Sequence, residues 1–240
     1  MSETTSRREV LREQLVRDAK AAARELILTE GLAGLTLAAV ARRLGVTSPA
    51  LYRYFDGRNG LVQAVYDELA GELTDALREA VERQDPDDIS AQLHAATRAV
   101  MTWSVANRVA FDMLMGSSFR TAASEADVAE VIPVTLGALF AKLFTRLYNE
   151  IGLEHPADEE IPPALRRQLE VYRLTLNPDL PLGVIYLMIT CWRQIYGLVS
   201  MAVHQHMSFA FCNHDLLFDD MMDQLLALIG LRRSPRLRID

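Results

Sequence analysis

Cysteine is scarce in this chain of 240 residues, which contains only Cys191 and Cys212. Two cysteines are too few for a disulfide framework, so we expect a reducing, intracellular compartment. Charged residues interrupt the apolar runs before they reach the roughly 20 residues that a membrane-spanning helix needs. The first 20 residues hold no apolar stretch of the kind found in a secretory signal. We therefore expect a cytoplasmic protein with no membrane partner.

Basic charge is also in deficit, because 32 Asp and Glu residues outnumber 25 Lys and Arg residues and give a net charge of −7. Such a chain is repelled by nucleic acid unless basic groups gather in one place. Residues 1–60 reverse the balance with 10 basic and 7 acidic side chains. A contact with nucleic acid is therefore expected from the first 60 residues.

Strand patterns and internal repeats are missing as well, and helical periodicity runs through the chain. Gly31, Gly45 and the segment Gly57–Gly60 are expected to separate the first four helices. The predicted helices cover residues 8–30, 37–44, 48–54, 61–83, 89–106, 108–118, 125–152, 163–175, 181–207 and 214–230. Pro133 is expected to kink or restart the helix over 125–152. The fold class is thus all-α, with a small amino-terminal unit and a larger carboxyl-terminal bundle.

These patterns also predict the domain boundaries. A small domain covers residues 1–60, and a connecting helix follows over 61–83. The polar stretch Gln84–Asp88 is interpreted as a linker that opens a second domain over 84–231. Residues 232–240 are expected to be a flexible tail.

The most informative stretch runs from Leu35 to Phe55 and reads LTLAAVARRLGVTSPALYRYF. Two short helices joined by a tight Leu-Gly-Val turn are the layout of a helix-turn-helix motif. A step of 100° per residue places Ser48, Pro49, Tyr52 and Arg53 on one arc of the second helix. This arc is short, polar and aromatic and carries a guanidinium group, which suits a reader of the DNA major groove. The alternative is a plain helical hairpin with solvated arginines.

Residues 8–70 resemble the DNA-binding domain of the TetR family of bacterial transcriptional regulators. The matching features are the long first helix, the sequence GLAGLT before the second helix, the Leu-Gly-Val turn, the sequence SPALYRYF, a basic residue three positions later and Leu61. The resemblance implies a homodimer that binds a palindromic operator in double-stranded DNA. It also implies a bundle that binds a small-molecule effector and then releases DNA. Such a protein is a regulator, more often a repressor than an activator, and neither an enzyme nor a user of cofactors.

The resemblance assigns DNA contacts by position. Thr36, Tyr52 and Arg58 match positions that touch backbone phosphates, and the family usually has lysine where Arg58 stands. Ser48 lies among the positions nearest to the base edges, and Arg53 with the arginines before residue 20 is expected to share the readout. The residues implied to contact DNA are Thr36, Thr47, Ser48, Pro49, Ala50, Tyr52, Arg53 and Arg58. Of these, Thr47 is expected to cap the recognition helix.

The segment from Trp192 to Gly197 resembles a Trp-x-x-x-His-Gly signature of one group of TetR carboxyl-terminal domains, with Tyr196 in place of the histidine. A cavity lined by aromatic and methionine side chains suits an apolar or flat effector. For each residue, packing in an ordinary core is the alternative. The residues expected around the effector are Trp103, Phe111, Met115, Phe140, Phe144, Tyr148, Trp192 and Tyr196, with Met113 and Phe119 nearby. Candidate polar anchors are Arg98, Asp112, Gln194 and His204, and for most of these the alternative is a surface or partner contact. The helices 181–207 and 214–230 are implied to form the dimer interface.

Two motifs point to other functions. Asp219, Asp220 and Asp223 have the spacing of a magnesium motif in all-α enzymes that act on isoprenoid diphosphates, but no second acidic motif accompanies them. Carboxylates near the start of a helix, where they complement its dipole, are the simpler interpretation. Four residues have side chains that commonly bind metals and raise the alternative of a metal sensor: His204, His206, Cys212 and His214. Their spacing matches no common zinc arrangement. A DNA-binding protein that responds to no ligand is a further alternative.

Overall fold

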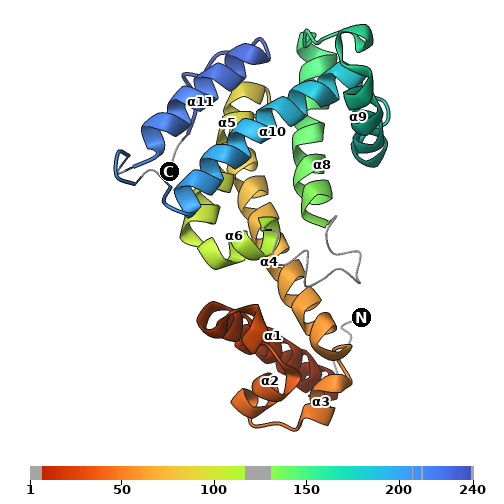
Figure 1. Cartoon of the computed structure of the whole chain (residues 1–240), viewed down its shortest axis with the longest axis vertical. Coiled ribbons are helices and arrows are strands. Elements are labelled where there is room, and N and C mark those ends of the chain that lie inside the picture. The colour runs from red at the N-terminus through yellow and green to blue at the C-terminus, as the bar shows by residue number, and fades with distance from the viewer. Residues whose placement is uncertain (1–6, 117–130, 207, 212, 239–240) are drawn as a thin grey trace. The chain divides into compact units, whose positions relative to one another are not determined.

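The computed structural model describes residues 7–116, 131–206, 208–211 and 213–238, and every regular element within these ranges is a helix (Figure 1). The chain divides into two compact units. The amino-terminal unit comprises the described parts of residues 1–71 and 112–128. The carboxyl-terminal unit comprises the described parts of residues 72–111 and 129–240. The all-α prediction is confirmed for the described residues.

The amino-terminal unit contains α1 (Arg7–Gly34), α2 (Leu37–Leu44), α3 (Ser48–Tyr52) and the first part of α4 (Gly57–Glu82). The predicted end of the first helix at Gly31 is visible in the backbone, since φ of 71° interrupts the helical geometry there before one more turn. The buried residues lie on the facing sides of these helices. They include Ala19, Ala22, Ala23, Leu26 and Ile27 of α1, Leu37, Val40 and Ala41 of α2, and Leu51 of α3.

The predicted break at Gly57–Gly60 is wrong, because α4 already begins at Gly57. Gly57 has a φ of +60°, which an L side chain adopts only with strain, so it turns the chain into the helix. Gly60 lies in the first helical turn, and its N–H donates to the carbonyl of Asp56 at 2.9 Å. A Cβ atom at Gly60 would lie 3.3 Å from the backbone of Phe55. Both glycines thus serve the start of the helix rather than a gap before it.

The carboxyl-terminal unit is a bundle around α5 (Ile89–Ala106) and α10 (Leu182–Val203). α10 contacts α5, α8, α9 and α11. The surrounding elements are α6 (Arg108–Met115, which ends in the other unit), α8 (Val131–Arg146), a π-helix η2 (Leu147–Ile151), a 3-10 helix η3 (Asp158–Glu160), α9 (Pro163–Leu176) and α11 (Asp215–Leu228). The predicted bounds of α5, α9, α10 and α11 are confirmed to within four residues. Parts of the predicted helices 108–118 and 125–152, with Phe119, lie outside the described residues; Pro133 falls in the first turn of α8.

The segments predicted as a linker and as a tail are joined to each other by hydrogen bonds, which the sequence did not suggest. Gln84 is buried, and its side-chain amide donates to the carbonyl of Arg238 at 3.0 Å and accepts from the N–H of Arg238 at 3.0 Å. The Ser90 hydroxyl donates a hydrogen bond to the carbonyl of Arg232 at 2.6 Å. The Ser234 hydroxyl donates one to the carboxylate of Asp88, which is the N-cap of α5. We call residues 231–238 the carboxyl-terminal strap, because they fasten the end of α4 to the start of α5.

α10 has the length and apolar composition of a membrane-spanning helix, although no such segment was expected from the sequence. Half of its most apolar 18-residue stretch is buried inside the unit. Arg193 interrupts this stretch and is exposed. A core helix of a bundle meets the same criteria of length and composition, and α10 packs as one.

Candidate functional site

The turn between α2 and α3 is closed by its own residues. Thr36 is extended and its hydroxyl accepts from the N–H of Ala39 at 3.0 Å, which fixes the start of α2. Gly45 ends α2 in the left-handed region with φ of 67°. The N–H of Val46 then donates to the carbonyl of Ala41 at 3.0 Å. These contacts fix the tight turn that joins α2 to α3 in the helix-turn-helix.

α3 exposes the arc that the sequence predicted. Leu51 is completely buried, whereas 62% of Tyr52 is exposed on the other side of the helix. Pro49 and Arg53 are exposed, and Ser48 is half-buried. Of the other residues assigned to DNA, Thr47 is exposed and Ala50 is half-buried. Within its unit this arc is therefore open to a partner.

Thr47 occupies the N-cap of α3, but the prediction that its side chain caps the helix is wrong. A capping hydroxyl accepts from the N–H of the second or third helical residue. The second residue is Pro49, which has no N–H, and the N–H of Ala50 donates to the backbone carbonyl of Thr47 at 2.9 Å. The Thr47 side chain is instead exposed beside the start of α3.

Arg58 is anchored inside the amino-terminal unit. Its Nε donates to the carbonyl of Leu35 at 3.0 Å, and one terminal nitrogen donates to the carbonyl of Leu32 at 2.6 Å. Both carbonyls belong to the segment where α1 ends, whose helix dipole favours a positive charge. Arg58 therefore ties the start of α4 to the connection between α1 and α2, a role that its position in the motif did not reveal.

The residues proposed to surround an effector fall into separate groups. In the carboxyl-terminal unit, the ring of Phe111 stacks on Tyr196 with centroids 6.1 Å apart, and Tyr196 lies 6.1 Å from Trp192. Phe111 also meets His204 edge to face at 6.1 Å. We call Phe111, Trp192, Tyr196 and His204 the ring cluster.

The other predicted residues of this set lie elsewhere or remain unassigned. Tyr148 pairs with His155 at 5.7 Å, and Phe144 is buried while Phe140 is half-buried on the same helix. Trp103 is half-buried, and Met115 lies in the part of α6 that belongs to the amino-terminal unit. The sequence could not separate these residues from the ring cluster, because all have the same apolar or aromatic character.

Arg98 is a tie between helices rather than an anchor for a ligand. Its guanidinium donates to Asp215 at 2.7 Å and to Asp219 at 2.8 Å, both on α11, and lies 3.7 Å from the ring centroid of Phe218. Arg233 of the strap pairs with Asp223 at 2.9 Å and with Asp219 at 3.6 Å. Two of the three aspartates in the suspected magnesium motif thus face guanidinium groups.

The metal readings gain no support from the described residues. Within them, no group of three or more His, Cys, Asp or Glu side chains has a metal-binding arrangement. Asp220 accepts from Gln224 at 2.7 Å, and the rings of His204 and His206 pack 5.6 Å apart. Cys212 lies outside the described residues.

His94 is a buried group that no sequence pattern singled out. It is 1% exposed, packs edge to face on Phe218 at 5.5 Å, and neither ring nitrogen has a hydrogen-bond partner. Burial, followed by the positive charges of Arg233 and Arg98, lowers the pKa of His94 to about 4. The imidazole is therefore neutral at physiological pH.

Comparison with known proteins gives matches to both units. Residues 21–65 match a family model described as bacterial regulatory proteins of the tetR family. Residues 93–225, more than half of the chain, match a second model described as the tetracyclin repressor-like carboxyl-terminal domain. Of the curated relatives, the HTH-type transcriptional regulator Rv1816 of Mycobacterium tuberculosis is 26% identical over 221 residues, which cover 91% of this chain and 94% of that protein.

Solved structures share the fold at lower identity. SCO4313, described as a regulatory protein, aligns with a TM-score of 0.70 and 23% identity over 92% of this chain and 100% of that one. A protein of unknown function from Rhodococcus sp. RHA1 aligns with a TM-score of 0.67 and 19% identity over 91% of this chain and 95% of that one. A tetR-family regulatory protein from Rhodococcus RHA1 has a TM-score of 0.58 and 17% identity over 91% and 98% of the two chains.

Proposed function

Since the chain belongs to the TetR family of bacterial transcriptional regulators and is a DNA-binding regulator rather than an enzyme, we propose that it is a homodimeric repressor released from its operator by a small molecule. The exposed arc of α3 supports this proposal, because its side chains are free to contact DNA. A regulator of this kind works on DNA, so we place it in the cytoplasm. We propose that the reader occupies residues 1–60, that residues 61–83, most of which belong to α4, connect it to the bundle, and that the effector and dimer domain occupies residues 84–231.

The recognition helix reads the operator through its first turns. Ser48, Pro49 and Ala50 lie at the amino-terminal end of α3, the end that meets base edges in helix-turn-helix proteins. Arg53 adds a guanidinium that can donate to guanine or phosphate. Tyr52, Thr36 and Thr47 offer exposed hydroxyl groups to backbone phosphates. Arg58 acts mainly by positioning α4, because its donors already point to carbonyls of the protein.

The dimer forms through the outer faces of α10 and α11. α10 contributes the half-buried small residues Gly197 and Ser200. α11 exposes 80% of Leu216 and 44% of Leu228. The exposed apolar side chains of α11 favour burial against a second copy, and the small residues of α10 permit close approach. Two such helices from each protomer form a four-helix bundle.

The effector binds beside the ring cluster. The half-buried Trp192 and the exposed Tyr196 offer aromatic surface beside the buried Phe111, and His204 adds a polar group next to Phe111. Binding there favours a dimer arrangement whose two copies of α3 no longer match successive major grooves, so that DNA is released by a population shift. A largely apolar or aromatic molecule is the class of effector that this surface suits.

Release of a labelled operator tests the proposal. The operator is first selected from a random pool, and aromatic and apolar compounds are then titrated against the complex while fluorescence anisotropy reports release. We expect Trp192→Ala to raise the effector concentration needed for release at least tenfold while affinity for DNA without effector stays within twofold. Tyr186→Ala, on α10 but outside the ring cluster, is the matched control. Equal effector responses of the two variants would contradict the assignment of the effector site.

A further inference from the structure

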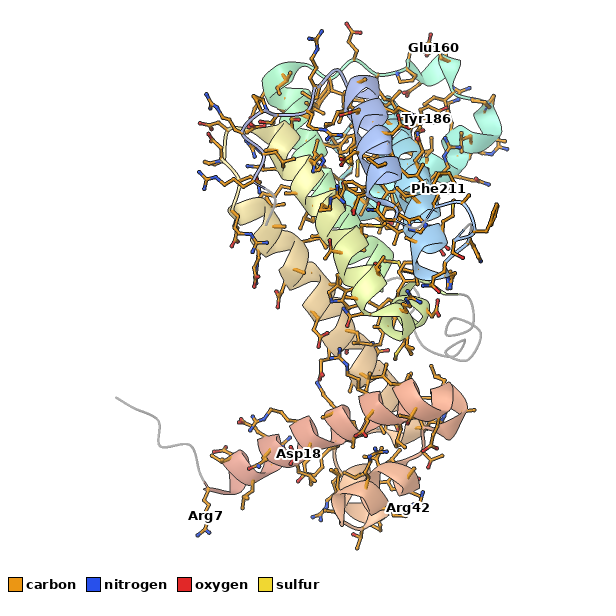
Figure 2. All side chains as sticks on the ribbon, turned by 90° about the vertical axis from the view of Figure 1, so that its left-hand side faces the viewer. Arg7, Asp18, Arg42, Glu160, Tyr186 and Phe211 are labelled. Atoms are coloured by element: carbon orange, nitrogen blue, oxygen red, sulfur yellow. The ribbon has the colours of Figure 1, made fainter. Side chains whose placement is uncertain are left out.

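The first turns of α1 extend beyond the packed part of the amino-terminal unit. Apart from Arg8, whose side chain is not described, every side chain from Arg7 to Gln14 is exposed, and the first buried residue of the helix is Ala19. At 1.5 Å per residue, this exposed extension is about 12 Å long. Figure 2 shows Arg7 at the start of α1, with Asp18 farther along the same helix. The extension is therefore accessible to a partner.

Two arginines near the start of α1, Arg12 and Arg17, lie on different sides of the helix. Arg12 precedes Ala19 by seven residues, or about two turns, so it lies on the face that α1 turns toward its own core. Arg17 lies about 140° around the helix from Arg12 by the same count. It pairs with Glu13 at 4.0 Å, and both side chains are largely exposed. Arg12 thus lies on the side of α2 and α3, and Arg17 lies on another side of the helix.

A direct contact places Arg12 beside the recognition helix. Its guanidinium lies 5.7 Å from the ring centroid of Tyr54, which follows Tyr52 and Arg53 in sequence. The stack holds the cation next to the carboxyl-terminal end of α3, with the exposed Arg53 adjacent. When the amino-terminal end of α3 meets base edges, Arg12 lies beside the opposite end of the same helix.

We infer that Arg12 contacts the phosphates that flank each half-site, outside the groove read by α3. This inference rests on the proposed function. A guanidinium matches phosphate geometry with paired donors, and its stack on Tyr54 limits the side-chain freedom lost on binding. Such a contact adds affinity without sequence preference and makes binding depend more steeply on salt. The extension of α1 thereby lengthens the footprint of each protomer on DNA.

Binding of the full-length protein to two duplexes tests this inference. One duplex contains the selected operator with natural flanks, and the other ends at the edges of the half-sites. Arg12→Ala is expected to weaken binding to the flanked duplex about tenfold and to reduce the salt slope by about one for each of the two phosphates that the variant dimer no longer neutralises. Affinity for the trimmed duplex should equal that of the wild type. Arg12→Lys, which keeps the charge, should retain most of the binding to the flanked duplex.

Arg17→Ala is the matched control: the variant removes the same charge from the same helix, on the side away from Tyr54, at a side chain that pairs with Glu13. This pairing and its side of α1 separate Arg17 from the amino-terminal arginines that we expected to share the readout. The affinity of Arg17→Ala for both duplexes should stay within twofold of the wild type. Equal losses for Arg12→Ala and Arg17→Ala on the flanked duplex would overturn the inference in favour of general charge attraction. Equal losses for Arg12→Ala on both duplexes would overturn it in favour of a role in orienting α3. A wild-type protein that retains neither duplex would overturn the proposed function as well.

Discussion

Replacing Arg58 by alanine should loosen the amino-terminal unit, and not only weaken a contact with DNA. The substitution removes a hydrogen bond of 3.0 Å to the carbonyl of Leu35 and one of 2.6 Å to the carbonyl of Leu32. A hydrogen bond to a charged group contributes about 1.5–3 kcal/mol when it is well shielded. Because the side chain is only half-buried, solvent screening reduces both contributions. We therefore expect a loss of about 2 kcal/mol in local stability.

Amide hydrogen exchange followed by mass spectrometry measures this loss where it occurs. A loss of about 2 kcal/mol corresponds to exchange about 30-fold faster in peptides that cover the end of α1 and the start of α4. Arg58→Lys should lie between the wild type and alanine, because lysine keeps the charge but lacks the paired donors. Arg53→Ala, the same charge change at the exposed end of α3, should leave exchange within about twofold. Unchanged exchange in Arg58→Ala together with lost operator affinity would contradict a stabilising role for Arg58 and would favour a direct contact with phosphate.

Three other substitutions test separate parts of the structure. Ser48→Ala should change the order in which operator variants are preferred, and an unaltered binding profile would remove Ser48 from the base readers. Because the native pKa of His94 is about 4 and an unfolded histidine titrates near 6.5, the unfolded state alone takes up this proton between those values. As the pH is lowered from 6.5 to about 4, the free energy of unfolding of the wild type should therefore fall by about 1.4 kcal/mol per pH unit more than that of His94→Leu. Urea titrations at several pH values measure this difference, and parallel curves for the two proteins would contradict it. Gln84→Ala removes two hydrogen bonds to Arg238 and should cost about 2 kcal/mol and lower Tm by about 5 °C, whereas an unchanged Tm would deny the strap a stabilising role.

The helix-turn-helix could be predicted because its signals are local. Thr36 caps α2 through a residue three positions later, and Gly45 reverses the chain where the sequence pattern places the turn. The exposed arc of α3 follows from a step of 100° per residue and the burial of Leu51. Each of these features is decided within a few residues, so a single sequence contains the necessary information.

The features that escaped prediction depend on contacts between distant residues. Gln84 and Arg238 are 154 positions apart, and no local pattern distinguishes the strap from a solvated end. Arg58 reads as one more surface arginine until Leu32 and Leu35 are brought within reach of its donors. Gly57 resembles a helix breaker in sequence, and only its backbone angle identifies it as the entrance of α4. Tertiary structure decided each of these cases.

One experiment tests directly whether a dimer reads DNA through two copies of α3. Duplex DNA is selected from a random pool, and the enriched sequences are then footprinted. We expect an inverted repeat whose half-sites lie about 34 Å apart, or a multiple of this spacing, because two copies of α3 must enter major grooves on one face of the duplex. Protection should be symmetric about the centre of the repeat and should weaken steeply as salt rises. Enrichment of sequences without two-fold symmetry, or no retained duplex even in dilute salt, would contradict a dimeric regulator that reads its operator through α3.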